Sequence, residues 1–141
     1  MTPVQQSQVL VCPHCKRKTA LPPRNREGKS PNQHYWPTGN VALNLLCNVC
    51  RNLSVHSQGM VRPALVESEG LGAPPSVFVR ITFGCDQDNC GLPFSLHIRT
   101  EAQTTEDELT TWGRSAIATT ACSAGHPLGQ NSTVISIVRI Q

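Results

Sequence analysis

The sequence predicts a mainly β protein with one short helix, organised as two tandem modules that are built on β-hairpin knuckles. Three observations predict this fold class. β-Branched and aromatic runs flank closely spaced cysteines, the cysteine spacing recurs in the two halves, and a single segment begins with a helix-capping pattern. The 141 residues are 38% hydrophobic and 4% aromatic. Two halves of about 70 residues would each have a thin core, so each is expected to need a staple such as a metal ion or a disulfide.

Strands are expected where β-branched, aromatic and leucine residues cluster beside the cysteines. These segments are residues 8–11, 41–46, 52–57, 77–83, 92–98 and 133–140. One helix is expected from Thr105 to about residue 112 or a little beyond, because Glu108 follows Thr105 as in a capping box and acids fill the first turn. By contrast, residues 16–36 contain three prolines and no apolar period, which predicts a long basic loop.

The cysteine spacing indicates a duplication. The first half has the pattern C-x2-C-x31-C-x2-C, and the second half has C-x4-C-x31-C-x3-H. The only two tryptophans fall 11 and 10 positions before the third cysteine of their half. On this register His126 takes the place of Cys50. We therefore expect two modules, residues 1–70 and 71–141, joined through the Gly-, Pro- and Ser-containing segment 66–76.

The cysteines are expected to bind metal rather than to form disulfides. The N-terminal residues MTPVQQSQVLVCPHC lack the basic region and apolar run of a signal peptide, so the reducing cytoplasm is the expected compartment. Seven cysteines are an odd number, which argues against a complete disulfide framework. Zinc prefers four thiolate or imidazole ligands in a tetrahedron, and the cysteines with one histidine fill two such shells. We predict two structural Zn²⁺ ions per chain, one bound by Cys12, Cys15, Cys47 and Cys50, the other by Cys85, Cys90, Cys122 and His126.

The segments VCPHCKRKT and LCNVCRNLS resemble the cysteine-bearing knuckles of zinc ribbons, which are small β-domains. The resemblance implies a zinc-stapled β scaffold for both halves and no particular function. The second half departs from the ribbon pattern in the four-residue gap between Cys85 and Cys90. Two alternatives stay open: the CxxC pairs could be redox pairs, or the first pair could share a metal with the third, as in RING-type domains.

Charge is uneven along the chain. Residues 1–60 carry seven Lys and Arg against one acid, whereas residues 61–141 carry five Arg against eight acids. A basic segment between two rigid knuckles can meet the phosphates of a nucleic acid or an acidic protein, although a solvated loop has the same composition. The candidate phosphate- or partner-binding residues are Lys16, Arg17, Lys18, Arg24, Arg26 and Lys29.

We therefore expect a zinc-binding adaptor or regulator with a protein or nucleic-acid partner, and as the alternative a redox-responsive zinc–thiolate protein. An enzyme is not expected, because the chain has no HExxH, no deaminase-type zinc motif and no nucleophile motif. No catalytic residue and no small-molecule substrate is therefore predicted. No membrane association is expected, since no apolar stretch approaches the roughly 20 residues that span a bilayer.

Overall fold

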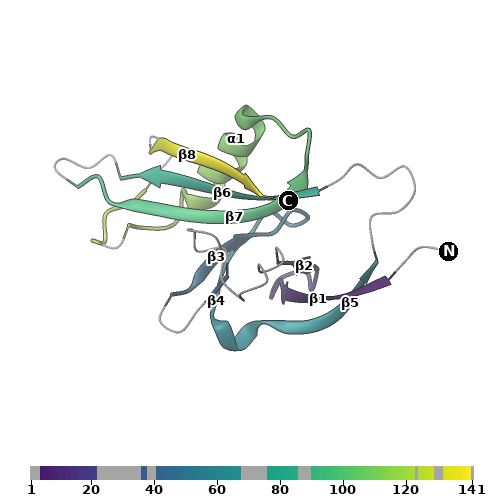
Figure 1. Ribbon diagram of the computed structural model, residues 1–141. Helices are drawn as coiled ribbons and strands as arrows, with labels where there is room; N and C mark the ends of the chain where they lie inside the picture. The colour runs from purple at the N-terminus through teal and green to yellow at the C-terminus, as the bar shows by residue number, and fades with distance from the viewer. Residues whose placement is uncertain are drawn as a thin grey trace.

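The computed structural model describes residues 4–21, 36–37, 41–67, 76–85, 90–122, 124–128 and 132–140. This described part is mainly β with one α-helix, which confirms the predicted class (Figure 1). It contains no helix that is long and apolar enough to cross a membrane. The elements are β1 (Val4–Val11), β2 (Lys18–Ala20), β3 (Leu43–Leu46), β4 (Leu53–His56), the 3-10 helix η1 (Gln58–Met60), β5 (Arg62–Glu67), β6 (Ser76–Gly84), β7 (Pro93–Glu101), α1 (Glu106–Ile117) and β8 (Thr133–Ile140).

The strands form two sheets. A three-stranded sheet has the order β2-β1-β5, and a five-stranded sheet has the order β4-β3-β7-β6-β8. Neighbouring strands are antiparallel except β3 and β7, which run parallel with Leu45 beside His97. The five-stranded sheet thus takes strands from both residues 1–70 and residues 71–141. The boundary expected near residue 70 lies outside the described residues, and the two-module organisation stays a prediction.

Helix α1 covers one face of the five-stranded sheet (Figure 1). The Thr105 side chain accepts a hydrogen bond from the Glu108 N–H at 3.2 Å, so the helix begins where the capping pattern predicts. Leu109, Gly113 and Ile117 are its buried residues, and their spacing of four places them on one side of the helix. They close a core with the sheet residues Val77, Val79, Ile81, Phe83, Leu96 and Ile98.

The three-stranded sheet lies on the opposite side of the five-stranded sheet from α1 (Figure 1). Successive side chains of a strand point to opposite faces, so Phe78 enters this second core while its neighbour Val79 faces the helix. Arg99 of β7 donates two hydrogen bonds to the Ala20 carbonyl of β2, at 2.8 and 3.2 Å, and these join the two sheets. The second core consists of Leu10, Leu21, Trp36, Leu43, Leu45 and Phe78.

Every strand that the sequence predicts is present, and β8 has the predicted bounds. Two strands are not predicted. β2 lies at the start of the segment expected to be a long loop, and that expectation is wrong there because Leu10 pairs with Thr19. β5 contains Pro63 and forms the edge of its sheet, where proline is tolerated. Residues 22–35 of the expected basic loop lie outside the described part.

Candidate metal centres

The first CxxC pair lies in a tight turn between β1 and β2, which we call the first knuckle (residues 12–17). The Lys16 N–H donates to the Cys12 carbonyl at 2.9 Å, and the Cys12 N–H donates to the Arg17 carbonyl at 2.9 Å. Lys16 has a φ of 67°, in the left-handed region that lets the chain turn back after the second cysteine. This turn brings Cys12 and Cys15 to the same side of the hairpin.

The second knuckle (residues 47–52), between β3 and β4, has the same geometry. The Arg51 N–H donates to the Cys47 carbonyl at 3.0 Å, the Cys47 N–H donates to the Asn52 carbonyl at 3.1 Å, and Arg51 has a φ of 60°. The amides of Val49 and Cys50 both donate to the Cys47 sulfur at 3.5 Å. Amides that point at a sulfur favour its thiolate, which is the form that binds metal.

The third knuckle (residues 85–92), between β6 and β7, accommodates the wider gap between its cysteines. The Cys85 N–H donates to the Leu92 carbonyl at 3.0 Å, and Gly91, directly after Cys90, has a φ of 64°. Leu92 lies two positions after the second cysteine, as do the acceptors in the first two knuckles. The third knuckle therefore closes with the same hydrogen bond at its base, and the extra residues fall within residues 86–89, outside the described part.

The fourth ligand pair follows α1 and lies in a different turn. The Cys122 N–H donates to the His126 carbonyl at 2.9 Å, and the Gly125 N–H donates to the Cys122 carbonyl at 2.8 Å. The left-handed residue here is Gly125, with a φ of 88°, which precedes the second ligand instead of following it. An isolated bridge between Ala121 and Pro127 closes the base of this turn.

The first cluster brings together the four sulfurs of Cys12, Cys15, Cys47 and Cys50, all within 4.8 Å of one another. The Sγ atoms of Cys12 and Cys50 are 3.6 Å apart, and those of Cys15 and Cys47 are 3.5 Å apart. Four sulfurs at about 2.3 Å from a tetrahedral zinc lie about 3.8 Å from one another. A disulfide needs about 2.05 Å, and all seven cysteines are free. The spacing therefore fits a metal ion.

The second cluster brings together Cys85, Cys90, Cys122 and His126, again with the ligand atoms within 4.8 Å of one another. The Cys90 and Cys122 sulfurs are 3.7 Å apart, and His126 Nδ1 lies 3.7 Å from the Cys122 sulfur and 3.8 Å from the Cys85 sulfur. Tetrahedral zinc predicts about 3.6 Å between a sulfur and a nitrogen ligand. Each cluster draws its ligands from one half of the chain, so the first and third pairs do not meet.

The thiols of a cluster differ in acidity. The Asn52 amide, aided by neighbouring thiols, lowers the pKa of Cys50 to about 6. The Arg17 amide lowers the pKa of Cys15, but desolvation and three neighbouring thiols outweigh it and raise that pKa to about 11. Burial raises the pKa of Cys122, but backbone amides of the fourth turn and two thiols lower it to about 7. Adjacent thiolates repel, so a cluster gives up all its protons most readily around a divalent cation.

Four exposed cations lie close in sequence to the cysteines of the first cluster. Lys16 and Arg17 belong to the first knuckle, Lys18 begins β2, and Arg51 belongs to the second knuckle. Four thiolates with one zinc carry a net charge of about −2, which these side chains offset. The other candidate partner-binding residues, Arg24, Arg26 and Lys29, lie outside the described part.

The two clusters lie at opposite ends of the five-stranded sheet. β3 and β7 run parallel, with Leu45 beside His97; Cys47 follows the end of β3, whereas Cys90 precedes the start of β7. Cys47 and Cys90 are therefore nine residues apart in the register of these two strands, which corresponds to on the order of 30 Å along the strands. Each metal ion would therefore hold a different end of the molecule.

A contact that the sequence does not predict joins the second knuckle to the C-terminal half. The Arg51 guanidinium carbon lies 3.5 Å from the centre of the Trp112 ring in α1, a cation–π contact. Trp112 is partly buried against the helix-side core. The sequence shows both residues, but nothing in their spacing predicts that they meet.

Comparisons with protein-family models, with curated protein sequences and with solved structures find no match. The resemblance to zinc ribbons therefore gains no support from a family match. The metal-binding inference rests on the ligand geometry of the two clusters.

Proposed function

We propose that this is a small zinc-binding protein with two structural zinc ions, one in each cluster, that acts as an adaptor for a protein or nucleic-acid partner. The observation that carries the metal assignment is the tetrahedral spacing of four ligand atoms in each cluster. Four protein ligands leave no position for a catalytic water, which supports a structural rather than an enzymatic role.

The energetic reason for zinc is the small size of the structure at each end of the sheet. Structural zinc contributes on the order of 10 kcal/mol or more to folding, which is comparable with the whole stability of a small domain. Among the described residues, the turn at residues 121–127 is held internally by one isolated bridge and two backbone hydrogen bonds. The second ion would hold this turn against the third knuckle.

Elemental analysis of the purified chain tests the metal assignment. We expect two zinc ions per chain in the wild type and one in His126→Ala, while His126→Cys keeps both because thiolate replaces imidazole as the fourth ligand. His14→Ala is the matched control, because His14 lies in the first knuckle but in neither cluster. One ion in the wild type, iron in place of zinc, or two tightly held ions in His126→Ala would contradict the assignment.

The adaptor role is supported by cations on a rigid turn. Lys16, Arg17 and Lys18 are exposed beside Cys15, where a bound zinc would fix the backbone. Pull-down of the tagged, zinc-loaded protein from native lysate, with and without nuclease, separates protein from nucleic-acid partners. Gel shifts at low salt test direct nucleic-acid binding, which should weaken steeply as salt rises. Absence of any specific partner in both assays would contradict the adaptor role.

One observation favours a second candidate function, a redox-responsive zinc–thiolate protein. Cys15 is exposed, whereas Cys12 and Cys47 of the same cluster are buried. A peroxide can therefore reach one sulfur of the first cluster, and its oxidation would weaken zinc binding. Zinc release that is reversed by a thiol reductant supports this function, and a cluster that resists mild peroxide argues against it.

A further inference from the structure

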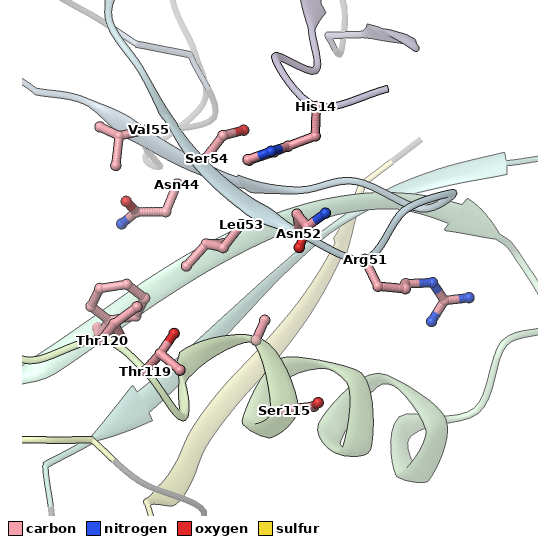
Figure 2. Close-up of a pocket in the computed structure, with 12 residues that line it drawn as sticks. His14, Asn44, Arg51, Asn52, Leu53, Ser54, Val55, Ser115, Thr119 and Thr120 are labelled. Carbon is pink, nitrogen blue, oxygen red and sulfur yellow. The ribbon is translucent and has the colours of Figure 1, made fainter. Parts of the chain in front are cut away.

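A groove lies between the β3–β4 hairpin and the C-terminal half of α1 (Figure 2). Its volume is about 640 Å³, within the range of roughly 300–1,000 Å³ that is typical of ligand sites. Arg51 stands at one end, and Thr119 and Thr120 at the other (Figure 2). The groove belongs to neither metal cluster.

One wall of the groove is an open strand edge. β4 is the outer strand of the five-stranded sheet, and among the described residues it pairs only with β3. The Cys47 N–H bonds the Asn52 carbonyl, and hydrogen-bonded pairs alternate along an antiparallel ladder. Ser54 and His56 therefore bond to β3, while the N–H and C=O groups of Leu53 and Val55 point outward. An extended chain could pair with these groups.

The floor of the groove is apolar and incompletely covered. Val55 is 62% exposed, and Leu53 and Phe94 are partly buried at the edge of the helix-side core. Because Leu53 and Val55 lie two residues apart on one strand, their side chains share the face that meets α1. An aliphatic side chain of an added strand would bury these surfaces.

Arg51 presents a fixed cation at the mouth of the groove. Its guanidinium is stacked on Trp112, and its Nε donates to the Asn48 carbonyl at 3.3 Å. No other hydrogen bond of this guanidinium is formed within the described residues, so its terminal nitrogens are available. A stacked, oriented guanidinium is suited to a bidentate pair with a carboxylate.

The charge of the residues that line the groove favours a negatively charged ligand. Among the described residues that line the groove, Arg51 is the one permanent cation, and none is Asp or Glu. Lys16 and Arg17, which follow the lining residue His14 in the sequence, are exposed cations of the first knuckle. The main-chain groups, the apolar floor and the cations together fit an extended peptide that carries aliphatic and acidic residues.

We propose that this groove binds an extended acidic segment of a partner protein, which adds as a strand to the open edge of β4 and places a carboxylate against Arg51. This inference rests on the proposed adaptor function and names its partner class. A nucleic acid in the same groove is the alternative outcome of the test.

The probe is a phage-displayed library of random octapeptides, selected against the zinc-loaded protein. We expect enrichment of peptides that combine valine, isoleucine or leucine with aspartate or glutamate. A synthetic copy of an enriched peptide should bind about 10- to 100-fold more weakly to Arg51→Glu, the loss expected when a charge-assisted pair is removed. Val55→Asp should weaken binding by placing a charge on the apolar floor.

Controls separate the groove from other surfaces. Arg62→Glu changes an exposed arginine in β5, outside the groove, and should leave binding unchanged. N-methylation of alternate peptide amides should abolish binding in one register and spare it in the other, which only a strand ladder explains. All variants are compared at equal zinc content, so loss of metal is not mistaken for loss of the groove.

Three results would overturn the inference. The first is that the library yields no enrichment of acidic peptides. The second is that an enriched peptide binds Arg51→Glu as tightly as the wild type, and the third is that it binds Arg51→Glu normally but no longer binds Lys16→Glu. Displacement of the peptide by a single-stranded oligonucleotide of mixed sequence would reassign the groove to nucleic acid. Each of these leaves the zinc content untouched, so failure of the groove is distinguishable from failure of the metal assignment.

Discussion

Gly113 of α1 should not tolerate a methyl group, because the helix approaches the sheet too closely at this point. A Cβ at Gly113 would lie 2.7 Å from Phe83 Cζ and 2.9 Å from Cε2, whereas ordinary contacts between carbons are about 3.5–4.0 Å. Phe83 is fully buried, so its ring would have to move by about 1 Å within a filled core.

The expected cost of Gly113→Ala follows from two opposing terms. Overpacking in a core costs typically 1–3 kcal/mol, and alanine in a helix interior returns about 1 kcal/mol relative to glycine. With the ring fully enclosed we expect a net destabilisation of about 1–2 kcal/mol, a fall in Tm of roughly 3–6 °C for a chain of this size.

Thermal and urea unfolding of the zinc-loaded variants measures this effect. Gly59→Ala is the matched control, because no atom lies within 4 Å of its added Cβ. Phe83→Leu in the Gly113→Ala background should be less damaging than the sum of the two single changes, since the smaller side chain makes room. A Gly113→Ala protein as stable as the wild type would refute the close approach of helix and sheet.

Three further predictions concern pH, oxidation and metal removal. Burial lowers the pKa of His56 below its usual 6.5, so the unfolded chain takes up a proton that the folded chain does not. The free energy of unfolding therefore falls as pH drops below about 6.5, by at most about 1.4 kcal/mol per pH unit. The urea midpoint should change less with pH in His56→Gln than in the wild type, and identical pH profiles would argue against this. Under limiting peroxide, zinc should leave the first cluster before the second because Cys15 is exposed. A chromophoric chelator measures the released zinc, and mass spectrometry measures the oxidation of Cys15. Earlier release from the second cluster would contradict this. Removal of zinc with EDTA should expose the amides of residues 120–128 to hydrogen exchange before those of β6 and β7, because β6 is paired with both β7 and β8 along its length. Simultaneous loss of protection would indicate a single cooperative unit.

The residues of the two clusters could be predicted because the spacing of a knuckle is a local property of the chain. Two cysteines separated by two residues fit one tight turn, and the left-handed residue follows directly, as Lys16 and Arg51 do. The helix start at Thr105 was likewise predictable, since a cap needs only the side chain and the next turn. The pairing of Cys122 with His126 came from the recurring spacing, and the structure brings both to Cys85 and Cys90.

The two strands that were not predicted show the limit of prediction from local sequence pattern. β2 has only three residues and no apolar run, and it is a strand because Val9, Leu10 and Val11 lie opposite it. β5 carries Pro63 and a mixed sequence, and it exists because β1 offers it an edge. Neither segment has enough local preference to specify a strand without its neighbour.

The sequence by itself determined the candidate ligand sets, most of the strands beside them and the helix, because each depends on residues close along the chain. The tertiary structure alone decided that β3 pairs with β7 across the two halves, that Arg51 stacks on Trp112, and that β4 pairs only with β3 among the described residues. These features depend on which surfaces of distant segments fit together, and spacing along one sequence does not encode that fit.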